Sequence, residues 1–250
     1  MCKNKMDAMK HGIYIGTSGW SYEHWKGCFY PHTLPARDFL GYYQQLFNCV
    51  EINNTFYRLP DEHSFLHWYE SVPDNFVFSV KASRFISHMK KLKDPAETVP
   101  PFMQQVKLLA NKLGPILFQL PPRWRCNPQR LEAFLRSLPA ADHYVFEFRD
   151  SSWFTQQTYT LLKHYNAAFC IYDLASHLSP LEVTADFVYI RLHGPGEAYC
   201  GSYTAKALRD WAKKIMDWHE KGIQVYCFFD NDQAGYAVKN ALQLKMMVEV

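Results

Sequence analysis

The stretch from Tyr144 to Trp153, YVFEFRDSSW, decides the interpretation of the whole chain. Phe146 and Phe148 lie on one face of an expected strand. Glu147 and Arg149 lie on the opposite face, because strand side chains have a period of two. Turn residues follow at once. An apolar strand with charged residues at its carboxyl end, followed by a turn and a helix, is the unit from which (β/α) barrels build active sites.

The same unit recurs along the chain. Short apolar runs typical of strands lie at residues 13–16, 49–53, 76–80, 116–120, 144–148, 168–172, 187–192 and 223–229. Helical spacing of apolar residues occupies most of the intervals, for example 37–47 and 208–218, and we expect a helix to begin near Pro101, since proline suits a first helical turn. The sixth interval, 173–185, has no helical pattern, so that unit is predicted to be degenerate.

Strands that alternate with helices indicate right-handed crossovers and a parallel sheet. A length of 250 residues suits one barrel of this kind. We therefore predict an α/β protein with a single-domain TIM (β/α)₈ barrel at residues 13–250, after an N-terminal extension at 1–12.

Composition excludes several classes of protein. Hydrophobic residues make up 48% of the chain and charged residues 20%, which provides a large core and argues against disorder. The net charge of +3 is too small to indicate nucleic-acid binding by itself. Seven cysteines without a CxxC pair indicate no disulfide framework, and the first residues lack the apolar segment of a signal peptide. We expect a cytoplasmic protein that makes no membrane contact.

A ring of polar side chains is predicted at the carboxyl ends of the strands, where barrel enzymes have their active sites. The candidate catalytic residues are Glu51, Glu147, His193 and Asp230. The candidate substrate-binding residues are Ser18, Trp20, Tyr22, Trp25, Asn53, Lys81, Arg84, Gln119, Arg149, Asp173, Arg191, Gly194 and Asn231. Buried charges must be paired, solvated or ligated. Ion pairs that only fill the end of the barrel, such as Glu147 with Arg149, are the structural alternative.

Three smaller patterns within the ring each have two interpretations. The HGPG sequence at 193–196 could cradle an anion with its backbone N–H groups or could form a plain tight turn. The carboxylates and the one imidazole would suit a divalent cation, Mg²⁺ or Mn²⁺, although no tight ligand spacing is present. The aromatic residues Trp20, Tyr22 and Trp25 could stack on bases or sugars, or pack a loop core.

Seven strings of the sequence are informative together: GTSGWSYEHWKGCFYP, VEINNTFYRLP, FSVKASRFISH, ILFQLPP, FEFRDSSW, FVYIRLHG and VYCFFDND. In combination they resemble the domain-of-unknown-function 72 family, the YecE-like proteins, from about Ile13 to Leu244. The resemblance implies a TIM-barrel fold and a cytoplasmic protein of a bacterial or archaeal type. It implies no established activity. The recurrent polar positions of the family coincide with most of the strand-end residues named above.

Three functions fit the ring. The first is a hydrolase or lyase that acts on a phosphate-bearing small molecule or nucleic acid, with Glu147 or Glu51 as general base and His193 as acid or metal ligand. Four cations would hold the phosphate, since guanidinium forks match its oxygens: Lys81, Arg84, Arg149 and Arg191. The second is a glycosidase-like enzyme with two carboxylates. The third is a module that binds a nucleotide or nucleic acid without chemistry and is weakened by salt. The sequence predicts no oligomeric state.

Overall fold

A computed structural model describes residues 12–248 of the protein, which divide into two compact units. Unit 1 comprises residues 12–50, 171–181 and 186–248, and unit 2 comprises 51–170 and 182–185. The chain passes from one unit to the other four times, twice within strands, in β2 (Cys49–Ile52) and in β6 (Ala168–Leu174). Most of the expected extension at 1–12 lies outside the described residues, and the domain boundary at 13 stays a prediction.

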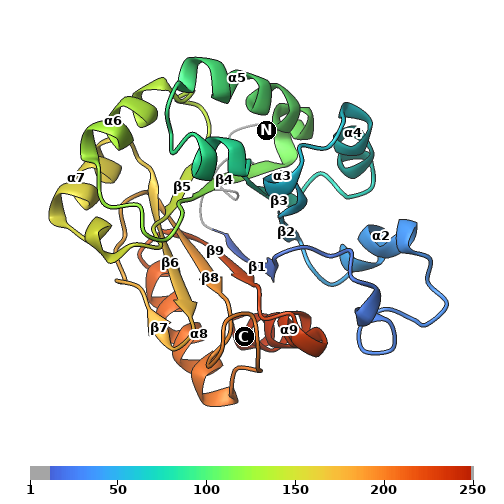
Figure 1. The fold of residues 1–250 in the computed structure, drawn as a ribbon. Coiled ribbons are helices and arrows are strands. Elements are labelled where there is room, and N and C mark those ends of the chain that lie inside the picture. The colour runs from blue at the N-terminus through green and yellow to red at the C-terminus, as the bar shows by residue number, and fades with distance from the viewer. Residues whose placement is uncertain (1–11, 249–250) are drawn as a thin grey trace. The chain divides into compact units, whose positions relative to one another are not determined.

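Unit 1 contains the first and the last strands of the sheet, in the order β1-β9-β8-β6. Its other strands are β1 (Ile13–Thr17), β7 (His177–Leu178), β8 (Phe187–Leu192) and β9 (Gln224–Phe229). Strand β9 runs parallel to both β1 and β8, whereas β7 pairs antiparallel with β6. The helices are α2 (Phe39–Tyr43), α8 (Ala205–His219) and α9 (Tyr236–Val248), with short 3₁₀ turns η1 (Glu23–Trp25), η2 (Ala36–Asp38) and η6 (Gln233–Gly235). Figure 1 shows β8 and β9 side by side, both in orange tones.

Local sequence explains the best-formed helix of unit 1. Thr204 caps α8, because its side chain accepts a hydrogen bond from the backbone N–H of Ala207. Leu208, Ala212 and Ile215 recur at helical spacing and are buried. Each large aliphatic side chain buried in this way contributes about 1.5–3 kcal/mol. Burial of this stripe, rather than helix propensity alone, holds α8 in place.

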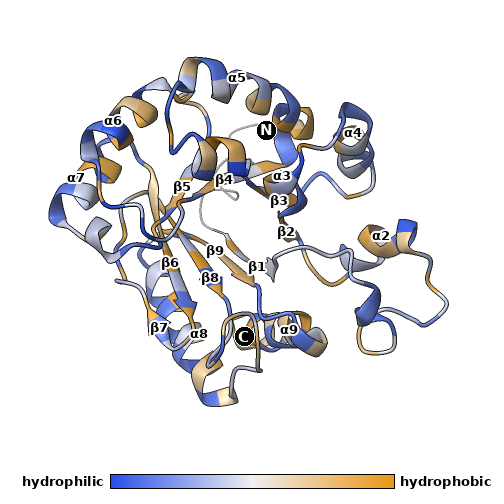
Figure 2. Ribbon diagram, in the orientation of Figure 1, coloured by the Kyte–Doolittle hydropathy of each residue, from blue (hydrophilic) through white to orange (hydrophobic). Residues whose placement is uncertain are grey.

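Unit 2 contains the strands that are intermediate in chain order, paired in the order β6-β5-β4-β3-β2. Strands β3 (Val77–Lys81), β4 (Leu113–Gln119), β5 (Tyr144–Glu147) and the start of β6 pair in parallel. The helices are α3 (Asn54–Tyr57), α4 (Glu62–Glu70), α5 (Pro95–Val106), α6 (Pro128–Ser137) and α7 (Gln156–His164). A π-helix, η3 (Phe85–Met89), and the 3₁₀ segments η4 (Lys107–Lys112) and η5 (Ser151–Trp153) complete the unit. In Figure 2, α6 alternates between hydrophilic and hydrophobic residues, in accord with its one buried face.

The predicted strands are all present, with ends that differ by up to three residues. The sixth interval is degenerate as predicted, since the short strand β7 takes the place of a helix between β6 and β8. The expected start of a helix at Pro101 is wrong, because α5 begins at Pro95 and contains Pro101 in its interior. Pro95 is the proline that occupies the first turn, where a backbone N–H has no helical partner to lose.

The helix predicted at 37–47 is also wrong in extent. The structure has only η2 and the five-residue α2 there. Gly41 lies in the middle of α2, and glycine costs about 1 kcal/mol relative to alanine inside a helix. Burial of Phe39, Leu40 and Tyr43 therefore holds a short helix instead of a long one. Across residues 12–248, no helix combines the length and the apolar character needed to cross a membrane.

Candidate functional site

All seventeen candidate residues lie in the described part of the chain, divided between the two units. Unit 1 contains Ser18, Trp20, Tyr22, Trp25, Asp173, Arg191, His193, Gly194, Asp230 and Asn231. Unit 2 contains Glu51, Asn53, Lys81, Arg84, Gln119, Glu147 and Arg149.

A buried ionic network in unit 1 joins Arg191, His193 and Asp230, which we call the Arg191 network. Arg191 Nη2 lies 3.2 Å from Asp230 Oδ2, and His193 Nδ1 lies 3.0 Å from the same oxygen. The side chains of Arg191 and His193 are 1% and 0% exposed, whereas that of Asp230 is 18% exposed. Arg191, which was predicted to hold phosphate, is therefore paired with Asp230 inside the protein.

The hydrogen bonds of His193 assign its tautomer. Arg191 Nη1 lies 3.3 Å from His193 Nε2, and a guanidinium can only donate. Nε2 is therefore the acceptor, and the ring proton resides on Nδ1, which donates to Asp230. Both ring nitrogens of His193 are engaged inside the protein, so neither is open to a substrate in this arrangement.

The glycine of the HGPG sequence serves an internal turn. Gly194 has a φ of +119°, and a Cβ at this position would lie 2.3 Å from the carbonyl oxygen of Cys200. Its N–H donates to Tyr203 Oη at 3.0 Å. The Tyr203 hydroxyl in turn bonds to Asp173, whose pKa is raised by burial. The geometry thus favours the turn interpretation over an anion-binding loop.

Asn231 lies fully buried beside this turn. Its Nδ2 donates to the carbonyl of Gly201 at 2.8 Å and to Asn240 Oδ1 at 2.9 Å. Its Oδ1 is buried and has no hydrogen-bond partner within residues 12–248. A buried acceptor of this kind costs about 1–3 kcal/mol. Asn231 therefore ties two loops of unit 1 together and retains one unused acceptor.

The aromatic candidates pack the loop after β1. Trp25 is fully buried, and its Nε1 donates to Asp232 Oδ1 at 2.6 Å. Tyr22 donates to the carbonyl of Ser18 at 2.6 Å, and Tyr30 donates to that of Trp20. These contacts favour the packed-core interpretation, because a ring buried on both faces has no face for a base or sugar.

Asp232 and His24 form a pair that is not among the candidate residues. His24 Nε2 lies 2.9 Å from Asp232 Oδ2. Burial raises the pKa of Asp232 from 3.8 to about 6, although the hydrogen bond from Trp25 and the contact with His24 oppose the shift. A single histidine in a loop gives no signal in the sequence, so only the structure reveals this pair.

In unit 2, Glu147 and Arg149 form an ion pair, which was the structural alternative to a role in catalysis. Arg149 Nε donates to Glu147 Oε1, and Cys170 Sγ lies 3.9 Å from Glu147 Oε2. The Glu147 side chain is 0% exposed and that of Arg149 is 9% exposed. Because Glu147 is buried against a guanidinium, it is suited to hold Arg149 in position and poorly placed to take a proton from a substrate.

The positive charges of three side chains in unit 2 lower the pKa of the His88 imidazole. These side chains are Lys81, Arg84 and Arg149, and together with His88 we call them the His88 cluster. Burial lowers the pKa of His88 most, followed by the charges of these three cations, while Glu147 opposes them. His88 is consequently held neutral near pH 7.

The hydrogen bonds of His88 leave one ring nitrogen open. Ser87 Oγ donates its proton to the carbonyl of Ser83, at 3.2 Å. It must therefore accept from His88 Nδ1, which lies 3.0 Å away. The lone pair of His88 Nε2 then makes no hydrogen bond within the described residues. The ring also packs edge-on against Phe56, whose face lies under Lys81 Nζ.

Sequence reasoning missed His88, although one structural feature marks it. It lies on η3, and single π-helical turns occur often at functional sites. The string FISH has no periodicity that separates a π-turn from an α-helix, so the signal exists only in three dimensions.

The other unit 2 candidates are less informative. Glu51 is fully buried, and Gln119 lies opposite Glu147 in the register of β4 and β5. Asn53 Oδ1 is buried without a partner among residues 12–248. Within the same residues, no group of three or more His, Cys, Asp or Glu side chains is arranged to hold a metal ion.

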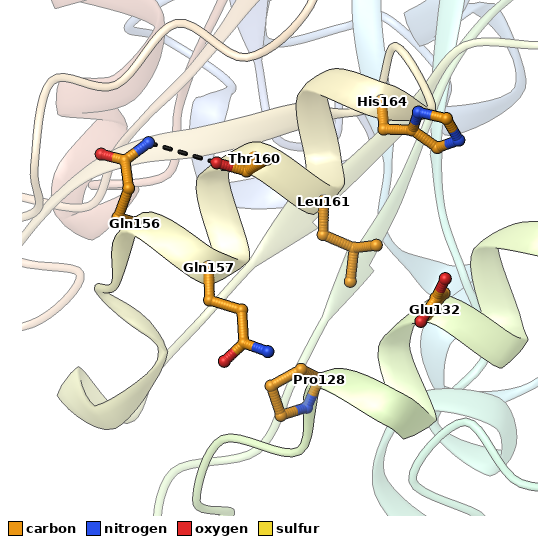
Figure 3. Close-up of a pocket in the computed structure, with 7 residues that line it drawn as sticks. All are labelled: Pro128, Glu132, Gln156, Gln157, Thr160, Leu161 and His164. Atoms are coloured by element: carbon orange, nitrogen blue, oxygen red, sulfur yellow. Dashed lines mark hydrogen bonds between the residues drawn. The ribbon is translucent and has the colours of Figure 1, made fainter.

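A groove of about 530 Å³ lies between α6 and α7 in unit 2. Figure 3 shows Leu161 and Pro128 beside it, with Glu132 and His164 at one side. Its remaining lining consists of Gln156, Gln157 and Thr160. These residues give it one carboxylate and one imidazole but no cluster of charges comparable with the His88 cluster.

Comparison with known proteins places the chain among relatives. The sequence pattern described as "Protein of unknown function DUF72" matches residues 14–250. The chain belongs to the DUF72 family. It is similar to the UPF0759 protein YunF of Bacillus subtilis, with 25% identity over 95% of both chains. It is also 34% identical to the UPF0759 protein YecE of Escherichia coli over 58% of this chain and 51% of that protein.

Solved structures of DUF72 proteins have the same fold. A DUF72 family protein of Thermotoga maritima superposes with a TM-score of 0.88 and 32% identity, over 96% of this chain and 100% of that one. A second, from Enterococcus faecalis, gives 0.82 at 20% identity over 96% of both chains. The predicted α/β fold class, a TIM-like (β/α)₈ barrel, is thereby confirmed. The family description names no activity.

Proposed function

We propose that the protein binds a phosphate-bearing substrate at the His88 cluster and acts as a phosphoester hydrolase or lyase. The observation that carries the proposal is the action of three cations, Lys81, Arg84 and Arg149, on one neutral imidazole. Like charges held together repel one another, and an anion with several oxygens relieves that repulsion. Phosphate is such an anion, and guanidinium forks match its geometry.

Each member of the cluster has a role in this proposal. Arg84 is exposed and would meet the phosphate first, while Arg149 would be aimed at it by the buried Glu147. Lys81 is fixed over Phe56, with its Nζ 4.4 Å from the ring centroid. The open Nε2 of His88 would act as general base, since a neutral imidazole can accept a proton.

The hydrolytic step balances with these groups and water. His88 Nε2 takes a proton from water as the water oxygen bonds to phosphorus. The ester oxygen leaves with the electron pair of the broken P–O bond and takes a proton from solvent water, while His88 returns its proton to solvent. A positioned base of this kind contributes typically about 10²–10⁴-fold in rate.

The glycosidase alternative receives less support. That mechanism needs two carboxyl groups that flank the sugar. Glu147 is 0% exposed and bonded to Arg149, so it has no face for a sugar ring. The alternative of a binding module without chemistry keeps the cations and gives His88 no catalytic part.

Turnover of a panel of phosphomonoesters, phosphodiesters and abasic DNA tests the proposal. His88→Gln should lower kcat by at least about 100-fold and retain binding of inorganic phosphate, whereas Arg84→Ala should weaken that binding. Arg136→Ala, on the exposed face of α6, is the matched control. Turnover unchanged in His88→Gln would reject the catalytic role, and phosphate binding without turnover of any substrate would favour the binding module.

A further inference from the structure

A second cationic pocket lies in unit 2, at the far end of η3 from Arg84. It has a volume of about 550 Å³, within the range of about 300–1,000 Å³ typical of small-ligand sites. Its lining consists of Met89, Lys90, Lys91, Lys93, Asp94, Trp124, Asn127 and Arg130. We call it the lysine pocket.

The charges of the lysine pocket are unbalanced. Four cationic side chains and one carboxylate line it, which gives a net charge of +3. Lys90 is paired with Asp94 at 2.9 Å. Lys91 and Lys93 are exposed and form no salt bridge within the described residues, so their charges remain available to an anion.

The loop that carries the lysines is fixed rather than extended into solvent. Lys91, Leu92 and Asp94 all have left-handed backbone, with φ of 48°, 61° and 51°. Such conformations cost about 1–3 kcal/mol each and persist only where the surroundings impose them. The Leu92 side chain is fully buried, and its N–H donates to the carbonyl of Ile86 at 3.0 Å. This anchor holds the lysines on either side of it outward.

An aromatic ring lies on the opposite wall of the pocket. Trp124 packs edge-on against the buried Trp153, with ring centroids 5.3 Å apart. The Trp153 indole N–H donates to the carbonyl of Trp124 at 2.7 Å, which fixes the backbone there. Trp124 itself is only partly buried. Arg130, which donates to the carbonyl of Lys91 at 3.4 Å, connects this wall to the lysine loop.

We propose that the lysine pocket binds a nucleoside phosphate, with the phosphate on Lys91, Lys93 and Arg130 and the base stacked on Trp124. Cations beside an aromatic ring are the combination by which proteins hold single nucleotides and single strands. The volume admits one nucleotide unit and is too small for a duplex. The ligand is thus a free nucleotide or one unit of a single strand. The inference does not depend on hydrolase activity at the His88 cluster.

The test measures binding alone, so that it is independent of turnover. Fluorescence anisotropy of a labelled deoxythymidine decamer is followed at several salt concentrations, with competition by thymidine monophosphate and by inorganic phosphate. We expect the double variant Lys91→Ala/Lys93→Ala to weaken binding at least about tenfold. It should also reduce the slope of the logarithm of the binding constant against the logarithm of salt concentration by about one to two. Trp124→Leu should weaken binding about 5- to 100-fold.

A control double variant and competition by two unlabelled ligands distinguish the possible results. Lys206→Ala/Lys213→Ala removes the same charge from exposed positions of α8 and should leave binding unchanged. Competition by the mononucleotide at concentrations equal to those of the decamer would identify a free nucleotide as the ligand, and much weaker competition would identify a strand. Equal loss of binding in the two lysine double variants, or no binding of any probe to the wild-type protein, would overturn the proposal. Competition by inorganic phosphate as strong as that by the nucleotide, with no effect of Trp124→Leu, would reject the stacked base.

Discussion

His193 in unit 1 and His88 in unit 2 each follow a strand of the sheet, but their surroundings differ. His193 is fully buried and both of its nitrogens are engaged, one by Asp230 and one by Arg191. His88 is partly exposed, donates only through Nδ1, and lies under the influence of three cations.

The difference lies in charge balance. In the Arg191 network, a buried guanidinium and a buried imidazole both contact the carboxylate of Asp230 within the protein. In the His88 cluster, three cations and one carboxylate act on a partly exposed imidazole. A buried network has little to gain from a ligand, whereas cations beside an accessible imidazole gain from an anion. Charged residues at a strand end therefore stabilise the fold when they are buried and paired with one another, and they form a candidate site when they lie beside an accessible group.

The largest change in the free energy of unfolding is expected when the Arg191 network is broken. Arg191→Met should lower the free energy of unfolding by about 3–5 kcal/mol, because it leaves Asp230 and His193 without their cationic partner. Urea unfolding followed by circular dichroism measures the loss. Arg209→Met, at an exposed position of α8, should change the free energy by no more than about 0.5 kcal/mol. Equal stability of the two variants would show that the Arg191 network is not structural.

A smaller loss is expected at the turn beside that network. Tyr203→Phe removes the hydroxyl that accepts from Gly194 N–H and bonds to Asp173. The free energy of unfolding should fall by about 1–3 kcal/mol, since the buried N–H of Gly194 and the partly buried carboxyl of Asp173 each lose a partner. Tyr57→Phe serves as control, because the Tyr57 ring is 75% exposed. A wild-type unfolding midpoint for Tyr203→Phe would refute the importance of this bridge.

The pH dependence of stability tests Asp232. Its folded pKa of about 6 is above its ordinary value of 3.8, so the folded chain holds the proton more tightly than the unfolded chain. Relative to Asp232→Asn, the wild-type protein should therefore lose stability as pH rises from about 3.8 to about 6. Urea midpoints across this range measure the difference, with the exposed Asp217→Asn as control. A difference in urea midpoint between the wild-type protein and Asp232→Asn that does not change with pH would contradict the raised pKa of Asp232.

The smallest effect concerns the titration of His88. Its folded pKa is lower than 6.5, so the unfolded chain binds the proton more tightly and this contribution to stability falls as pH drops below 6.5. Arg84→Ala removes one cation and should raise the pKa of His88, as followed by NMR of the ring carbon protons. Arg136→Ala should not change it. A pKa of His88 at or above 6.5 in the wild-type protein would remove the electrostatic basis of the proposed site.

The sequence by itself determined the order of strands and helices, the degenerate sixth unit and the fold class. These depend on period-two and helical spacing of apolar residues, which a chain displays locally. It also singled out Lys81, Arg84 and Arg149 as strand-end cations. It placed the start of α5 wrongly, because either Pro95 or Pro101 could fill a first turn and only packing selects between them.

Only the tertiary structure decided which charges cancel. Whether Arg191 meets Asp230, whether Trp25 is a buried anchor of Asp232, and whether His88 keeps an open nitrogen all depend on contacts between residues distant in sequence or on the exact turn of η3. The lysine pocket likewise requires the loops at 89–94 and 124–130 to come together. Pairing and desolvation of charge are properties of three-dimensional neighbours, and for that reason the sequence named the charged residues without assigning their roles.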